Sequence, residues 1–175
     1  MVARELPAAL RYLKGIAPYQ YAVFGCTSAS AVNGREGMLA IQQQMERELG
    51  CPSITVLGAV LREIENRKAR SVAVLTPYIQ EVNIFFRKTM ETFGVEMCSI
   101  AGMGLPSDND IAALKPSTIL DYARSQREHI PARADLCFFS CTNVRSAEIR
   151  EQLEECLGRP VITSNQCVIR HIQSL

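Results

Sequence analysis

Two cysteines, Cys26 and Cys141, have matching neighbours in the two halves of the chain. The first lies in Gly-Cys-Thr-Ser and the second in Ser-Cys-Thr-Asn, and each follows a short apolar run. Two thiols that face one small acid can move a proton at carbon, or add to carbon and leave it, from opposite sides. The pair therefore predicts a site with two thiols and one ligand.

The similarity continues beyond the cysteines. Each copy leads into a helical segment and then into Leu-Gly-x-Pro-x-Ile-Thr, so that two pseudo-repeats cover about residues 20–55 and 135–163. The alternative is an old βα duplication whose cysteines only pack, which suffices for Cys137 because free cysteine is among the most buried residue types. It fits Cys26 and Cys141 less well, because polar residues follow them at once.

The hydroxyl residues after the cysteines predict a carboxylate site. A helix N-terminus at each place would favour the thiolate and offer unpaired N–H groups to an anion. Thr27, Ser28 and Thr142 would add hydroxyl donors. The alternative for these three residues is ordinary helix N-capping.

Two further polar residues are expected at the same edge. Tyr78 closes the strongest apolar strand in Thr-Pro-Tyr, where its phenol could donate to a carboxylate or an enediolate-like oxygen, although proline at a strand exit is also common in loops. Asn109, between two aspartates, is more typical of a helix N-cap, and a contact to the ligand is its second interpretation.

Apolar strands alternate with amphipathic helices along the chain. The pattern predicts strands at 21–24, 53–55, 71–75, 95–100, 136–139 and 161–164, and helices at 3–16, 37–49, 56–67, 80–93, 111–128 with a break near 115–116, 146–157 and from 166. This order is typical of an α/β fold with a parallel sheet covered by helices on both faces. We expect a single domain over residues 1–175, with its ligand beyond the carboxyl ends of the strands.

Composition narrows the class of protein. The chain has 175 residues, a formal charge of +1 and scattered basic residues, which predicts neither nucleic acid nor membrane as a partner. Seven cysteines in a chain of this kind indicate free thiols in a reducing compartment. We find no signal peptide and no apolar run of about 18 residues. We therefore expect a soluble, cytoplasmic protein.

The searches for metal and cofactor motifs are negative. His129 and His171 are too few for a metal site, and the glycines at 102 and 104 lack the third glycine of a dinucleotide-binding loop. We expect no metal and no cofactor.

With these residues assembled, the chain resembles the maleate cis-trans isomerase and arylmalonate decarboxylase family of the aspartate/glutamate racemase superfamily. The resemblance spans nearly the whole chain and rests on four motifs in order: Gly25-Cys26-Thr27-Ser28, Thr76-Pro77-Tyr78, Ser140-Cys141-Thr142-Asn143 and Pro-Val-Ile-Thr-Ser-Asn-Gln at 160–166.

The resemblance implies a cofactor-independent isomerase of small (di)carboxylic acids, with a small carboxylate as substrate and a homo-oligomer as its assembly. It assigns Cys26 as nucleophile or first base and Cys141 as the opposing acid. The residues that would hold carboxylates are Thr27, Ser28, Tyr78, Asn109 and Thr142.

The exact reaction stays open among three readings. In the decarboxylase branch the first cysteine position is glycine, so Cys26 argues against decarboxylation. The Cys-Thr-Asn and Ser-Asn-Gln runs favour maleate-type isomerisation. An amino-acid racemase acting on aspartate, glutamate or hydantoins is the alternative, and an inactive carboxylate-binding module is the third.

The chain departs from the family pattern at its start. Members begin with a further βα unit, whereas this sequence opens on what would be the following helix. We therefore expect an unpaired strand edge beside residues 21–24, and turnover that is weak until such a unit is restored.

Overall fold

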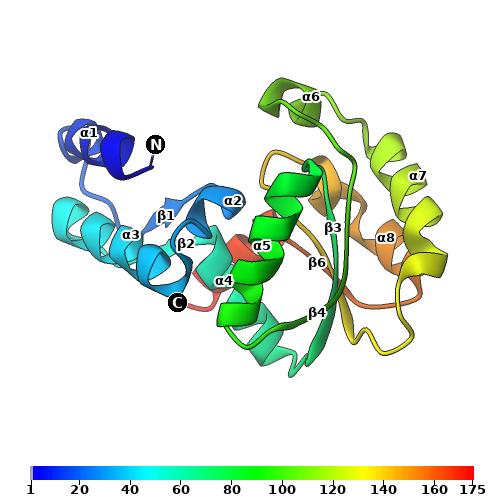
Figure 1. Ribbon diagram of the computed structural model, residues 1–175. Coiled ribbons are helices and arrows are strands. Elements are labelled where there is room, and N and C mark those ends of the chain that lie inside the picture. Colours follow the sequence, from blue (N-terminus) through cyan, green and yellow to red (C-terminus); the bar gives the residue numbers. More distant parts are fainter. Residues whose placement is uncertain (1) are drawn as a thin grey trace.

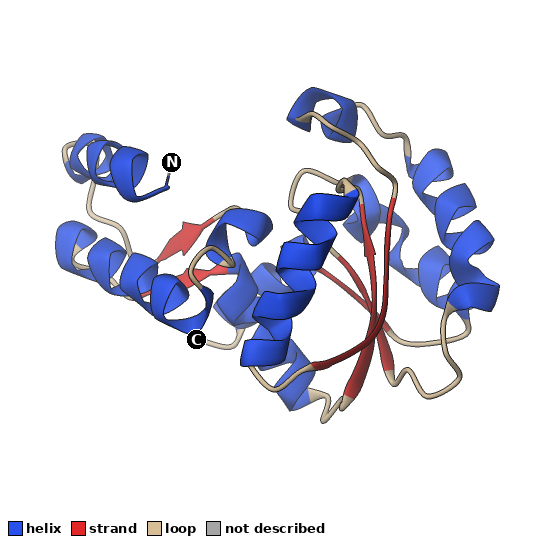
Figure 2. Ribbon diagram, in the orientation of Figure 1, coloured by secondary structure: helices blue, strands red, loops and turns tan. Residues whose placement is uncertain are grey.

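The structure is a computed structural model that describes residues 2–175, and it has the α/β architecture that the sequence predicts (Figures 1 and 2). The strands are β1 (Ala22–Phe24), β2 (Ser53–Thr55), β3 (Ser71–Thr76), β4 (Glu96–Gly102), β5 (Leu136–Phe139) and β6 (Val161–Thr163). The helices are α1 (Val2–Lys14), α2 (Thr27–Ser30), α3 (Gly34–Leu49), α4 (Val56–Asn66), α5 (Gln80–Thr92), α6 (Asp108–Ala112), α7 (Pro116–Gln126), α8 (Arg150–Leu157) and α9 (Ser164–Gln173), with 3₁₀ turns η1 (Arg127–His129) and η2 (Arg145–Ile149).

The strands form two parallel sheets, so the expectation of one sheet was wrong. β1 pairs with β2 alone, and the larger sheet has the order β4-β3-β5-β6. Helix α4 lies between the two sheets in Figure 1. Its buried residues, Val56, Leu57 and Val60 among them, belong to the core that also contains strand residues of the larger sheet. An apolar helix in this position keeps the two sets of strands from meeting edge to edge.

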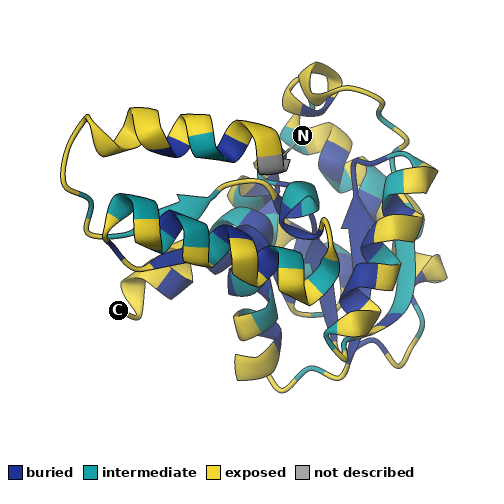
Figure 3. Ribbon diagram, turned by 60° about the vertical axis from the view of Figure 1, so that its left-hand side comes forward, coloured by how far each residue is buried: buried dark blue, intermediate teal, exposed yellow. Residues whose placement is uncertain are grey.

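Strands β3, β5 and β6 of the larger sheet are buried on both faces, which explains their near-continuous apolar sequences, whereas the edge strand β4 is half-buried. Alternate residues of β3 point to opposite sides. Val72 and Val74 pack in the core that includes α4 and α5, whereas Ala73 and Leu75 pack with α7 and α8. In Figure 3 the inner strands of this sheet are dark blue, its edge strand β4 is largely teal, and the outer surfaces of the helices are yellow.

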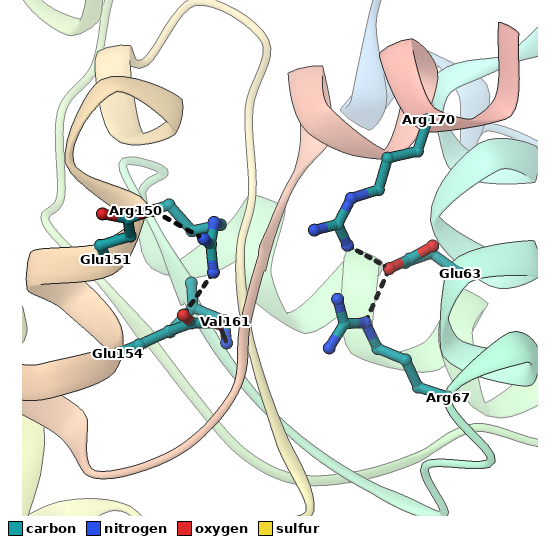
Figure 4. Close-up of polar contacts among 7 residues, drawn as sticks. All are labelled: Glu63, Arg67, Arg150, Glu151, Glu154, Val161 and Arg170. Atoms are coloured by element: carbon teal, nitrogen blue, oxygen red, sulfur yellow. Dashed lines mark hydrogen bonds and ion pairs between the residues drawn. The ribbon is translucent and has the colours of Figure 1, made fainter. Parts of the chain in front are cut away.

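The two pseudo-repeats share specific hydrogen bonds. In each half, a glutamate on the helix accepts a hydrogen bond from the backbone N–H seven positions later, at the first residue of the next strand: Glu46 from Ser53 at 3.3 Å and Glu154 from Val161 at 2.9 Å (Figure 4 shows the second pair). The glycine that ends each helix has a positive φ, 70° at Gly50 and 63° at Gly158, which glycine adopts without strain. The duplication read from the sequence is therefore present in the structure.

The halves differ at the outer edge of β1. Strand β5 pairs on both sides, with β3 and β6, and its residues are buried. Within residues 2–175, β1 pairs only with β2 and its residues are half-buried. The unpaired edge expected beside residues 21–24 is thus found in the described chain.

A close approach at Gly102 fixes the loop that carries Tyr78. A Cβ at Gly102 would collide with the backbone oxygen of Tyr78 and the side-chain nitrogen of Asn83. Asn83 is buried and accepts a 2.7 Å hydrogen bond from Thr76, whose hydroxyl in turn accepts from the Tyr78 N–H at 3.1 Å. Glycine is therefore required at the end of β4 for this loop to keep its place.

We predict that Gly102→Ala lowers the free energy of unfolding by about 1–3 kcal/mol, the usual range for overpacking. Urea denaturation measures the change. Gly15→Ala is the matched control, because a Cβ there meets only the Tyr12 backbone oxygen at an ordinary 3.6 Å. Equal stability of the two variants would contradict the close approach at Gly102.

Candidate active site

A cleft of about 290 Å³ opens where the first residues after β1, β3 and β5 come together. Cys26 and Cys141 both line it, one from each pseudo-repeat. Its lining residues are Cys26, Thr27, Ser28, Tyr78, Asp108, Cys141, Thr142 and Asn143. The structure thus brings together every site residue proposed from the sequence except Asn109.

Two larger hollows, of about 520 and 530 Å³, lie elsewhere around α4. The first contains Glu63, whose carboxylate already binds Arg67 at 2.7 Å and Arg170 at 2.5 Å (Figure 4). Neither of these hollows is lined by Cys26, Tyr78 or Cys141, and nor are two others of about 300 and 380 Å³, so the smaller cleft is the better candidate for the chemistry.

Cys26 is exposed at the carboxyl end of β1. Its backbone is extended, with φ of −125°, and it precedes the single turn of α2. The Ser28 hydroxyl lies 3.6 Å from its sulfur. The N–H groups of Thr27, Ser28 and Ala29 have no intrahelical acceptor and could donate to an anion beside the thiol, whereas the Ser30 N–H donates to the Cys26 carbonyl oxygen at 3.0 Å.

Cys141 differs from Cys26 in burial and backbone. It is buried and has a φ of 93°, in a loop that reaches the next helical turn only at Arg145. The expectation that it lies at a helix N-terminus was therefore wrong, because residues 140–144 are used to cross the cleft instead of starting a helix. Burial raises the pKa of the Cys141 thiol, so it is protonated at neutral pH.

Four hydrogen bonds to three other segments hold this loop. A positive φ at a non-glycine residue is strained and persists only where the surroundings fix it. The bonds are Cys141 N–H to Ser164 Oγ at 3.1 Å, Asn165 Nδ2 to Thr142 O at 3.0 Å, Thr142 Oγ1 to Gly25 O at 2.8 Å and Asn143 Nδ2 to Asp108 O at 2.8 Å.

Ser164 was missed by the sequence analysis. Its buried hydroxyl accepts hydrogen bonds from Thr27 Oγ1 at 3.0 Å and from the Cys141 N–H. It therefore joins the two halves of the site beneath the cleft. The sequence did contain a signal: Ser164 is polar at a position where the first repeat has the apolar residue Val56.

The two threonines of the cleft already donate their hydroxyl hydrogens within the protein. Thr27 donates to Ser164, and Thr142 donates to the Gly25 carbonyl oxygen. A carboxylate only accepts hydrogen bonds, so it would meet the backbone of these residues rather than their hydroxyl hydrogens. Of the three hydroxyl residues, Ser28 could donate its hydrogen to a bound carboxylate, since its hydroxyl contact among the described residues is the 3.6 Å approach to the Cys26 sulfur.

The Tyr78 phenol lies inside the cleft instead of at its mouth. It is buried, and its oxygen is 3.3 Å from the Ser140 hydroxyl. Burial raises the pKa of Tyr78, and the neighbouring Cys141 thiol raises it further. The phenol therefore keeps its proton and can donate it in a hydrogen bond.

The first turn of α6 places Asp108 in the cleft and leaves Asn109 out of it. Asn109 is also not the expected N-cap. Ser107 caps α6, because its hydroxyl accepts from the Asp110 N–H at 3.2 Å.

The described residues contain no group of three or more histidine, cysteine, aspartate or glutamate side chains placed to hold a metal ion. Over the same residues, every helix is too short or too polar to cross a membrane.

Known proteins resemble this chain in sequence and in fold. The model of the arylmalonate decarboxylase family matches residues 8–172. Arylmalonate decarboxylase of Bordetella bronchiseptica is 25% identical over 139 residues, which make up 79% of this chain and 58% of that protein. The chain therefore spans less than two thirds of this curated relative.

Solved structures share the fold. A crystal structure of arylmalonate decarboxylase has a TM-score of 0.83 and 23% identity, over 95% of this chain and 72% of that one. A maleate cis-trans isomerase mutant of Nocardia farcinica, with a covalently bound succinylcysteine intermediate, has a TM-score of 0.87 and 17% identity, over 98% and 72% of the two chains. Because the family model covers nearly all of the sequence, the chain belongs to the arylmalonate decarboxylase family.

Proposed function

We propose that the protein is a cofactor-independent isomerase of small (di)carboxylic acids that uses Cys26 and Cys141 as a pair. The observation that carries the proposal is their convergence, from the two pseudo-repeats, on one small cleft. The seven cysteines are free thiols in the structure, which supports a reducing, cytoplasmic setting. A homo-oligomer remains a prediction from the family resemblance.

The two thiols would have different roles. Cys26 is exposed and would act as nucleophile or first base, whereas Cys141 is buried and protonated and would act as acid. The Tyr78 phenol and the N–H groups that follow Cys26 would hold the substrate carboxylate. Cys26 also argues against decarboxylation, because that branch has glycine at this position.

Two reactions use such a pair. In cis-trans isomerisation the Cys26 thiolate would add to one alkene carbon while the Cys141 thiol gives its proton to the other, so that the bond between them becomes single and rotates. The proton would then return to Cys141 as the sulfur leaves and the double bond re-forms. The succinylcysteine in the Nocardia farcinica relative supports this path. In racemisation one sulfur would take the proton next to the carboxylate, and the other thiol would return a proton to the opposite face.

We predict that Cys26→Ala and Cys141→Ala each lower turnover at least about a hundredfold, because one thiol cannot perform both halves of the reaction. The measurement is proton NMR in deuterium oxide with maleate, aspartate, glutamate, hydantoins and arylmalonate. Isomerisation changes the alkene signals, racemisation exchanges the proton next to the carboxylate, and decarboxylation loses carbon dioxide. Full activity in either variant would refute the two-thiol mechanism.

We predict that iodoacetamide alkylates Cys26 faster than Cys141, and that maleate shields Cys26. Cys141 is buried and its raised pKa leaves little thiolate at neutral pH. Peptide mass spectrometry reads both rates, and half-exposed Cys98 and Cys156, outside the cleft, are internal controls. Shielding of Cys26 without turnover of any acid would favour the carboxylate-binding module over the enzyme.

Ser164 would hold the segments that carry the two thiols in a fixed position relative to each other. It accepts a hydrogen bond from each half of the site, so its removal leaves the Thr27 hydroxyl and the Cys141 N–H without an acceptor. An unsatisfied buried donor costs about 1–3 kcal/mol. The strained loop at Cys141 would relax at the same time, and the acid would leave its place.

We predict that Ser164→Ala lowers both the free energy of unfolding, by about 1–3 kcal/mol, and kcat, with a smaller effect on KM. Ser146→Ala is the matched control, because Ser146 is equally buried and its hydroxyl has no hydrogen-bond partner among the described residues. Its stability should change by less than about 0.5 kcal/mol. If the Ser164 variant loses stability but keeps kcat, Ser164 has only a structural role.

A further inference from the structure

Asp108 contributes a carboxylate to a cleft that otherwise has the features of a carboxylate site. Among the described residues that line the cleft, it is the sole carrier of a formal charge, and no lysine or arginine lies with it. Its backbone is held in place, because its carbonyl oxygen accepts a 2.8 Å hydrogen bond from Asn143 Nδ2. Its backbone position beside the cleft is therefore fixed, and its exposed carboxylate brings a negative charge to the edge of the site.

The charge is not needed to cap α6. Ser107 and Asp110 perform that role through a 2.6 Å bond between their side chains and the N–H bond already described. Over residues 2–175, the Asp108 side chain takes part in no hydrogen bond or ion pair. It raises the pKa of Cys141, which places its charge within electrostatic reach of that thiol.

A carboxylate at this place affects two kinds of ligand in opposite ways. A dianion such as maleate or succinate would bring its second carboxylate next to Asp108 with no cation to balance the pair, which is unfavourable. An ammonium group at the same place would pair with Asp108 and complete its missing contact. The cleft, at about 290 Å³, also limits the ligand to a small molecule.

We propose that Asp108 is the specificity-determining residue of this site, selecting small acids that carry an ammonium group beside the carboxylate over dicarboxylates that lack one. The inference rests on the proposed function, since it concerns the same cleft. It favours α-amino acids as the substrate class, and hence proton exchange rather than addition to an alkene. Asp108 acts here by charge and takes no part in bond making.

The test compares succinate with aspartate, which share a carbon skeleton and differ by the ammonium group. Each is titrated for its ability to shield Cys26 from iodoacetamide in the full chain. We expect aspartate to bind about three- to fivefold more tightly than succinate, the range for an exposed ion pair. In Asp108→Asn the ratio should fall to near one, with succinate binding more tightly than before.

Two further variants complete the experiment. Asp108→Glu keeps the charge and should keep the preference for aspartate. Asp121→Asn removes a carboxylate on α7, outside the cleft, and should leave the ratio unchanged. Far-UV circular dichroism confirms that each variant is folded.

The outcomes separate this inference from the proposed function. If both acids shield Cys26 and Asp108→Asn leaves their ratio unchanged, the role of Asp108 is refuted while the carboxylate site stands. If neither acid shields Cys26 in any variant, the carboxylate site and the role of Asp108 fail together. A ratio that collapses in Asp108→Asn and is kept in Asp108→Glu supports the inference.

Discussion

The Ser164 hydroxyl is the point on which the geometry of the site depends. It lies beneath the cleft and accepts hydrogen bonds from Thr27, which follows the first cysteine, and from the N–H of Cys141. A second hydrogen bond also joins the two halves, because the Thr142 hydroxyl, in the second half, donates to the Gly25 carbonyl oxygen in the first. Two pseudo-repeats that form separate sheets are thereby tied at the place where their cysteines meet. A two-thiol reaction needs this tie, because its rate depends on the position of both sulfurs relative to one carbon atom.

The duplication supplies two similar cysteines, and the fold makes them chemically different. Strand β5 lies inside a four-stranded sheet, and Ser140 and Cys141 that follow it are buried, whereas β1 belongs to a two-stranded sheet in which it pairs only with β2. Cys141 consequently sits in a low-dielectric place that favours the neutral thiol, and Cys26 meets solvent. Equivalent positions of the two pseudo-repeats thus hold one buried, neutral thiol and one exposed thiol without any change in residue type.

Local features of the fold could be predicted from the sequence, and features that depend on distant contacts could not. The strands at 53–55 and 136–139 and the helix ends at Gly50 and Gly158 follow from apolar periodicity and glycine chemistry close in sequence. The division into two sheets depends on how α4 packs, which periodicity does not show. Ser164 and Asp108 were missed for the same reason: their neighbours in the site come from other segments, and each reads alone as a helix-start residue.

The left-handed backbone at Cys141 makes this position prone to substitution by glycine. A side chain with φ of 93° stores about 1–3 kcal/mol of strain that glycine would release. Selection for thermal stability alone, as in a laboratory screen, would therefore favour glycine at position 141 and discard the thiol in one step. Cysteine at this position therefore costs stability, and only a use for its sulfur would offset that cost.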